Sequence, residues 1–138
     1  LGTLKFPLIL MQKDPMEMVK LADVVLAASG TATLLVGLLE KPMVIMYKMN
    51  ALTAYLARRF VRNTPYFGMI NLVLGREVCS EFFQEQATPE NLAKALAELV
   101  GSKSKRETVA GELKQARTRL GEKGATVRVA QELEDFLR

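Results

Sequence analysis

Two short, wholly apolar segments alternate with helix signals, and this alternation most restricts how the chain can fold. Residues 24–28 read VVLAA, and residues 43–47 read MVIMY. A strand that is apolar on both faces has to be buried on both, which is typical of a parallel sheet with helices on each side. We therefore predict an α/β fold with a parallel sheet, flanking helices and right-handed crossovers.

Two further apolar runs, residues 6–11 and 69–74, are predicted to be strands as well. Helix starts stand between the runs, because Asp14 and Thr88 are capping residue types and each is followed by a proline. We expect helices over residues 15–22, 32–39, 51–61 and 89–100, the last with Gly101 as its C-cap.

The last third of the chain, residues 103–138, changes character. It has no strand signal, and its apolar residues recur at helical spacing. Gly121 and Gly124 predict a break between two helices. Residues 103–128 carry eight basic side chains against three acidic ones, so we expect this part to be well solvated. We predict that it lies partly between domains and is held loosely beyond Gly121.

Composition excludes several kinds of chemistry. The 138 residues include no His and a single Cys, Cys79. A His general base, a Ser-His-Asp triad, a Cys-cluster metal site and an internal disulfide are therefore absent from this chain. The net charge is only +4 and no nucleic-acid motif is visible, which argues against a nucleic-acid partner. We predict no metal, no cofactor and an inert Cys79 thiol.

The turn after the apolar run at residues 24–28 is the strongest candidate for a binding site. Ser29-Gly30-Thr31 leads from that run into a helix, and Thr33 adds a further hydroxyl. A helix N-terminus there would direct N–H groups and the positive end of the helix dipole at a diphosphate. The same residues also fit an ordinary cap with a glycine turn, because the segment lacks the glycines of a Walker or dinucleotide loop.

A second cluster of polar side chains begins with Asn71, inside the mostly apolar run at residues 69–74, and continues after that run. An amide there is suited to a base or sugar, and an arginine can pair with a phosphate through two hydrogen bonds. The carboxylates are suited to sugar hydroxyls or to orienting the arginine. A solvated loop with a local Arg–Glu pair is the competing interpretation. The residues concerned are Asn71, Arg76, Glu77, Glu81 and Gln84.

The stretch from residue 41 to residue 76 contains six basic side chains and no acidic one. Its helical part has apolar residues at helical spacing beside Arg58, Arg59 and Arg62. Such a surface fits an anionic membrane or guides an anionic substrate. An ordinary core-facing helix with a basic solvent face is the alternative.

Several of these motifs occur in an order that carries a family resemblance over about residues 22–100. The combination resembles the lipid-A-disaccharide synthase family, which are glycosyltransferases of the GT-B type. The matching motifs are Ser29-Gly30-Thr31-Ala32-Thr33-Leu34, Lys41-Pro42-Met43-Val44, Tyr47-Lys48-Met49, Leu52-Thr53-Ala54 with Leu56-Ala57-Arg58-Arg59, Asn71-Leu72, Gly75-Arg76-Glu77, Glu81, Gln84 and Thr88-Pro89-Glu90-Asn91-Leu92.

The resemblance implies that this chain is the C-terminal, UDP-sugar-binding part of a hexosyltransferase. Residues 1–102 would form a Rossmann-like nucleotide-sugar-binding domain, and residues 103–138 the C-terminal helices of a GT-B fold. The parent reaction would join UDP-2,3-diacylglucosamine to 2,3-diacylglucosamine 1-phosphate in lipid A biosynthesis. The N-terminal acceptor domain, which would supply the catalytic base, is not in this chain, so we expect binding without turnover. The implied location is cytoplasmic, peripheral to the inner membrane.

The resemblance also assigns two groups of site residues. In the family a Glu usually stands where this chain has Leu35, and Glu40 is a poor substitute because five residues turn a helix by about 140° beyond one full turn. Another UDP-sugar GT-B enzyme, an epimerase domain, or a non-catalytic UDP-sugar or membrane-surface module remain alternatives. The diphosphate group is Ser29, Gly30, Thr31, Ala32, Thr33 and Arg76, and the nucleotide or sugar group is Tyr47, Asn71, Gly75, Glu77, Glu81 and Gln84.

Overall fold

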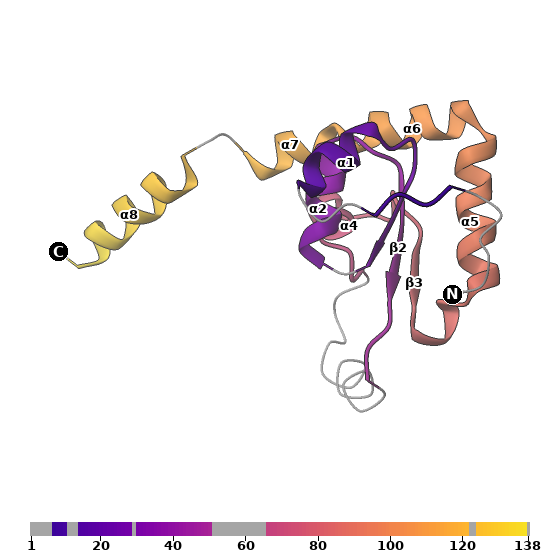
Figure 1. Ribbon diagram of the computed structural model, residues 1–138. Coiled ribbons are helices and arrows are strands. Elements are labelled where there is room, and N and C mark those ends of the chain that lie inside the picture. The colour runs from indigo at the N-terminus through magenta and orange to yellow at the C-terminus, as the bar shows by residue number, and fades with distance from the viewer. Residues whose placement is uncertain (1–6, 11–13, 29, 51–65, 122–123, 138) are drawn as a thin grey trace.

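Three parallel strands form the centre of the molecule (Figure 1). β1 (Val25–Ala28) pairs with β2 (Met43–Tyr47), and β2 pairs with β3 (Glu81–Phe83) in a register that sets Tyr47 opposite Phe83. The predicted α/β fold with a parallel sheet and flanking helices is confirmed. The computed structural model describes residues 7–10, 14–28, 30–50, 66–121 and 124–137.

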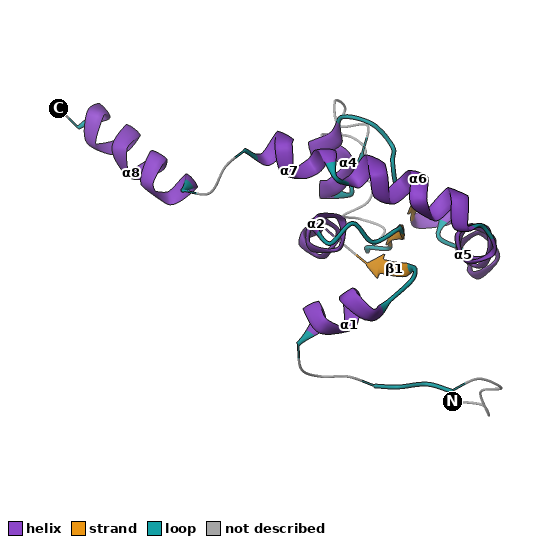
Figure 2. Cartoon of the chain, turned by 90° about the horizontal axis from the view of Figure 1, so that it is seen from above, coloured by secondary structure: helices purple, strands orange, loops and turns teal. Residues whose placement is uncertain are grey.

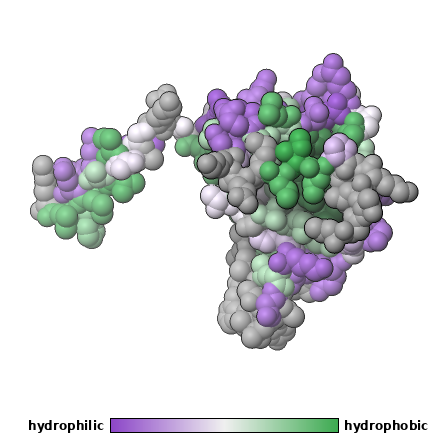
Figure 3. All heavy atoms as spheres, in the orientation of Figure 1, coloured by the Kyte–Doolittle hydropathy of each residue, from purple (hydrophilic) through white to green (hydrophobic). Residues whose placement is uncertain are grey.

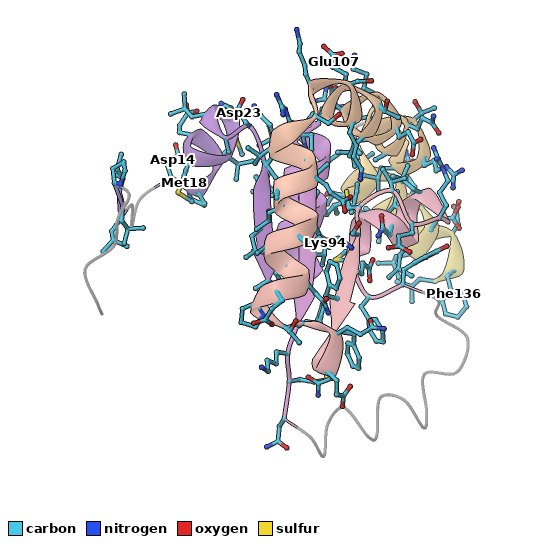
Figure 4. All side chains as sticks on the ribbon, turned by 90° about the vertical axis from the view of Figure 1, so that its right-hand side faces the viewer. Asp14, Met18, Asp23, Lys94, Glu107 and Phe136 are labelled. Atoms are coloured by element: carbon cyan, nitrogen blue, oxygen red, sulfur yellow. The ribbon has the colours of Figure 1, made fainter. Side chains whose placement is uncertain are left out.

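Helices cover both faces of this sheet. Seen from above, α2 and α4 lie on one side of the strands and α5 on the other (Figure 2), and α5 runs along the strands in Figure 4. α6 and α7 cross the end of the sheet at which the strands begin (Figure 1). The helices are α1 (Pro15–Leu21), α2 (Gly30–Leu38), α4 (Met69–Leu74), α5 (Pro89–Gly101), α6 (Lys103–Leu113), α7 (Gln115–Leu120) and α8 (Ala125–Phe136), with a 3-10 turn, η1 (Gln84–Gln86).

β2 is buried on both faces, and its alternating side chains divide the core into two parts. Met43 and Ile45 point to the side of α2 and α4, while Val44 points to the side of α5. Val44 and Ile45 are both 0% exposed. The uniformly apolar sequence of this strand therefore reflects burial on two sides. The principal buried partners are Val36, Ile70, Leu74, Leu113 and Ala116 on the first side and Leu92 and Leu99 on the second.

The prediction of a strand over residues 69–74 is wrong, because this segment is α4. Ile70 and Leu74 are four residues apart and are both buried, so they share the inward face of one helical turn. Gly75, with φ of +66°, ends the helix and donates its N–H to carbonyls of the last turn. Six residues, five of them apolar, are too few for their periodicity to separate a helix from a buried strand.

The ends of the sheet also differ from the prediction. Residues 7–10 form neither helix nor strand, and Leu8, Ile9 and Leu10 are 58% to 85% exposed. An apolar run becomes a strand only where a neighbouring strand pairs with it, and the sequence of this run does not reveal that neighbour. β3 was not predicted, because three residues give no pattern. The predicted helix over residues 51–61 lies outside the described residues.

Both predicted helix starts are confirmed. The Asp14 side chain accepts a hydrogen bond from the Glu17 N–H at 3.3 Å, and Thr88 Oγ1 accepts one from the Asn91 N–H at 3.2 Å. α5 includes Gly101 rather than stopping before it. Ser102 follows and caps α6, because its hydroxyl accepts the N–H of Lys105 at 3.2 Å.

The C-terminal helices divide into a packed part and a projecting part. Leu113 of α6 and Ala116 of α7 are 0% exposed and belong to the main core. The predicted break is confirmed, since Gly121 and Gly124 both have positive φ. Beyond it α8 projects away from the sheet (Figure 1), and Figures 3 and 4 show its apolar side and Phe136 at the surface. No helix among the described residues is long and apolar enough to cross a membrane.

We expect Gly37→Ala to destabilise the protein by about 1–3 kcal/mol, because a Cβ there would meet the side chain of Ile70, and such overpacking strains a core. The Cβ would lie 2.3 Å from Ile70 Cδ1. Gly111→Ala, in the open on α6, is the matched control and should gain about 0.5–1 kcal/mol. Urea unfolding measures both, and a shift of the same sign would contradict tight packing between α2 and α4.

We also expect the amides of α8 to exchange hydrogen at nearly the rate of an unstructured peptide in a dilute solution of this chain. Its large apolar side chains, Val127, Leu133 and Phe136 among them, are 57% or more exposed, so little tertiary packing protects the helix. The amides of β2 are the internal reference. Protection of α8 equal to that of β2 would show that α8 completes this core.

Candidate functional site

The first turn of α2 lies at the edge of the sheet where the strands end. β1 ends at Ala28 and α2 begins at Gly30, so the N–H groups of its first turn are directed toward this edge. Thr31 and Ala32 are exposed there, and the first turn contains no acidic residue. In open α/β sheets ligands bind outside the carboxyl ends of the strands. Ser29 lies outside the described residues.

Thr33 differs from the other residues of this predicted turn. It is 0% exposed, and its hydroxyl donates a hydrogen bond to the Gly30 carbonyl at 2.6 Å. A side chain so placed stabilises the first turn of the helix and has no surface to offer a ligand. The exposed part of the predicted diphosphate motif is therefore the backbone of the turn and the side chain of Thr31.

Tyr47 reaches this turn from the end of β2. A Cβ built on Gly30 would lie 3.2 Å from the Tyr47 hydroxyl and 3.8 Å from the Met69 sulfur. Gly30 is thus in close contact with both side chains, and a larger residue would push them apart. The structure brings the phenol O–H, a hydrogen-bond donor, beside the N-terminus of α2.

An aromatic group that the sequence had not singled out extends the same edge. Phe67 stacks on Phe83 with ring centroids 4.3 Å apart and an angle of 8° between the planes. Phe67 also meets Tyr47, with ring centroids 5.9 Å apart. All three rings are partly exposed. Tyr47 was among the predicted site residues, whereas Phe83 could not be placed at this edge before β3 was known, and no sequence pattern marked Phe67.

Asn71 lies beneath this edge rather than on it. It is 0% exposed, and its side-chain oxygen accepts the N–H groups of Val78 and Cys79 at 3.0 and 3.1 Å. Its amide nitrogen donates to the Cys79 carbonyl and to Glu81 Oε1, each at 2.7 Å. These four bonds use the full capacity of an Asn side chain. Asn71 thus has neither surface nor free donors for a base or a sugar.

Glu81 and Gln84 also bond to the backbone of this chain. Glu81 Oε2 accepts the Phe67 N–H at 2.7 Å, and Oε1 accepts the Gly68 N–H at 3.0 Å. The Gln84 amide bonds both the N–H and the carbonyl of Met49, each at 2.9 Å. These two residues fix the segments that follow β2 and precede α4, the two segments next to Tyr47.

Gly75, Arg76 and Glu77 lie at the other end of α4, near α6 and α7. Arg76 Nη1 pairs with Glu112 Oε2 at 2.6 Å, and Nη2 donates to Gln115 Oε1 at 3.3 Å. Because α6 and α7 cross the end of the sheet where the strands begin (Figure 1), Arg76 is not brought beside Gly30. Glu77 is exposed and accepts the Glu81 N–H at 3.4 Å.

The carboxylate that the family resemblance implies in α2 has no counterpart near the first turn of this helix, at either Leu35 or Glu40. Leu35 is partly buried in the middle of α2. Glu40 lies beyond the C-terminus of α2, with φ of +57°, and its carboxylate is 3.9 Å from Lys114 Nζ. The N-terminus of α2 thus keeps its positive potential unopposed by α2 itself, which favours an anionic ligand.

Cys79 is a structural residue. It is 1% exposed, and burial raises the pKa of its thiol to about 12, so the nucleophilic thiolate is not formed at neutral pH. This agrees with the prediction of an inert thiol. Among the residues that the structure describes, no three Asp, Glu or Cys side chains gather closely enough to hold a metal ion.

A cavity of about 450 Å³ opens at the same edge but on the side of α5. It is bordered by the end of β2, by η1 and by the start of α5, and no residue of α2 lines it. The charged residues of the lining are Lys48, Glu85 and Glu90, so the formal net charge of the lining is negative. A diphosphate is therefore better accommodated at the α2 turn than in this cavity.

Comparison with known proteins gives a consistent result. The profile of a family described as lipid-A-disaccharide synthetase matches residues 2–134. A lipid-A-disaccharide synthase of Anaeromyxobacter dehalogenans is 37% identical over 122 residues, 88% of this chain and 32% of that protein. One of Syntrophotalea carbinolica is 33% identical over 132 residues, 96% of this chain and 33% of that protein.

A third relative has a shorter and closer match. The lipid-A-disaccharide synthase of Dechloromonas aromatica is 48% identical over 88 residues, 64% of this chain and 23% of that protein. All three relatives are named as synthases, so an epimerase domain or a non-catalytic module is not favoured. The chain spans about a third of the length of the first two relatives.

The contacts of Arg76 generate a test of its role. We expect a double-mutant cycle of Arg76→Ala and Glu112→Gln, measured by urea unfolding, to give a coupling of about 0.2–1 kcal/mol, the range of partly exposed ion pairs. The pair is 42% and 34% exposed. The more exposed pair of Lys103 and Glu107 is the control and should couple less. Zero coupling would remove the structural role assigned to Arg76.

Proposed function

This chain belongs to the lipid-A-disaccharide synthetase family, and from that premise we propose that it is the part of such an enzyme that binds the UDP-sugar donor. The donor would be UDP-2,3-diacylglucosamine and the acceptor 2,3-diacylglucosamine 1-phosphate. Joining them gives the lipid A disaccharide. The activity and both substrates belong to the whole enzyme. The relatives that carry this name are about three times as long as this chain.

The observation that carries this proposal is the exposed first turn of α2 at the carboxyl edge of the parallel sheet. It combines a helix dipole, no acidic residue in the first turn, and the hydroxyl of Tyr47 beside Gly30. A diphosphate needs several N–H or O–H donors and a positive potential, and this turn offers both. We assign the diphosphate to Gly30, Thr31 and Ala32, with Ser29 preceding them in the sequence.

The proposed chemistry is an inverting displacement at the anomeric carbon of the donor sugar. As the bond to the sugar breaks, negative charge grows on the departing UDP. Preorganised N–H groups of the α2 turn stabilise such charge without having to reorient during the reaction. The acceptor hydroxyl needs a base, which we place in a part of the enzyme outside this chain. This chain alone would then bind the donor without turning it over.

We further propose a GT-B arrangement in which residues 1–102 form the donor domain and residues 103–138 the C-terminal helices. The enzyme would act on the cytoplasmic side, peripheral to the inner membrane. The support is the basic stretch of residues 41–76, which carries no acidic residue and suits an anionic surface. Half of its six basic residues, Arg58, Arg59 and Arg62, lie outside the described residues.

We expect this chain to bind UDP more tightly than ADP or GDP in titration calorimetry. The proposed donor carries uracil. We expect the aromatic side chains and the backbone of the protein beside the diphosphate to distinguish uracil from adenine and guanine. Equal affinity for the three nucleotides would leave a generic diphosphate site and contradict the assignment of a UDP-sugar donor.

Tyr47→Phe should weaken UDP binding about two- to tenfold, because it deletes one hydrogen-bond donor and keeps the ring in place. Arg76→Ala is the control and should leave the affinity unchanged, since its partners are Glu112 and Gln115. Unchanged affinity of Tyr47→Phe together with a loss of affinity in Arg76→Ala would contradict a diphosphate site at the α2 turn and favour one at the end of α4.

A further inference from the structure

We propose that Glu81 is a positioning residue of the donor site, which holds Phe67 and Gly68 against the α2 turn without touching the donor. This inference rests on the proposed function and adds a residue that acts through others. Its basis is the set of bonds that Glu81 makes. Oε2 accepts the Phe67 N–H at 2.7 Å, and Oε1 accepts the Gly68 N–H at 3.0 Å.

Asn71 holds the Glu81 carboxylate from behind. Its amide donates to Glu81 Oε1 at 2.7 Å, and its other three bonds tie it to the backbone of Val78 and Cys79. Asn71 is completely buried, so its orientation is fixed by the core. The carboxylate therefore receives three donors from two directions, and bonds to an ionised acceptor are about twice as strong as neutral ones.

The segment held by Glu81 has little freedom to move. A Cβ on Gly68 would lie 2.6 Å from Ile45 Cδ1 and 2.8 Å from Glu81 Oε1. The backbone of Gly68 is thus pressed between the sheet and the carboxylate. Losing the carboxylate would remove the partner of two N–H groups at this contact, which is costly for groups that are shielded from water.

The position of this segment is transmitted to the α2 turn through two side chains. The ring of Phe67 lies against Tyr47, whose hydroxyl is next to Gly30. The sulfur of Met69, the first residue of α4, is the other close neighbour of Gly30. A displacement of residues 67–69 would therefore change both side chains that flank the proposed diphosphate site.

The sign of the change in UDP affinity distinguishes a positioning role of Glu81 from a simple effect of its charge. Glu81→Gln keeps the size of the side chain and removes a negative charge from the surroundings of a diphosphate. By Coulomb interaction alone, that change strengthens the binding of any anion. A loss of affinity for UDP can therefore come only from altered geometry or from a lost direct contact. Altered geometry of the site is present before any ligand is added, whereas the loss of a direct contact has no effect until UDP binds.

The experiment compares wild type, Glu81→Gln and Glu81→Asp, with Glu132→Gln on the exposed α8 as control. Titrations use UDP and inorganic pyrophosphate. We expect both Glu81 variants to lose about tenfold or more in affinity for UDP, the scale of one charged hydrogen bond, and the control to lose none. Affinity for pyrophosphate should fall as well, because Tyr47 and Met69 flank the diphosphate site that it would occupy. Glu81→Asp keeps the charge but is too short to reach both N–H groups.

The amide spectrum without ligand supplies the second measurement. A positioning role predicts that the Gly30 and Tyr47 signals of both Glu81 variants are displaced before UDP is added. Unchanged signals together with lost UDP affinity would make Glu81 a direct ligand and overturn the proposal. Unchanged UDP affinity would leave Glu81 with a structural role only. Wild type that fails to bind UDP would overturn the donor function itself, and the role of Glu81 with it.

Discussion

Burial of β2 on both faces is the constraint on which the rest of the structure depends. Because Val44 and Ile45 are inaccessible from either side, helices have to cover the sheet twice, and the connections between strands have to return across it. All three strands then end at the same edge. The α2 turn, Tyr47 and Phe83 come together at that edge because they each follow or end a parallel strand.

The polar residues that the sequence marks as a site fall into two classes. Some, such as Thr31 and Tyr47, reach the edge where a ligand can approach. Others hold the backbone that forms the edge. Asn71 is the clearest case, since a motif residue with four internal bonds supports the site from within the core. A family motif therefore identifies residues that a site needs, and burial decides which of them a ligand can touch.

β2 was predicted correctly because Pro42 precedes it and Val44, Ile45 and Tyr47 are residue types that favour a strand. The prediction failed for α4, where a short, mostly apolar segment satisfies a strand or a helix equally well and tertiary packing decides. It also could not give the partner of Arg76, since Glu112 is 36 residues away and the pair forms only once α6 crosses the sheet. The helix after β1 was predicted, but it begins at Gly30 rather than at Ala32, so Gly30 and Thr31 belong to its first turn and not to a preceding loop.

The position of the diphosphate is tested most directly by mapping the backbone amide signals of the labelled chain while UDP is added. If the diphosphate binds at the α2 turn, the signals of Gly30, Thr31 and Ala32 move first and furthest, and those of Arg76 and Glu112 at the other end of α4 change little. Unchanged signals in the α2 turn, with the largest changes at Arg76 and Glu112 or at Lys48 and Glu85 beside the cavity at the start of α5, would contradict a diphosphate site at this turn.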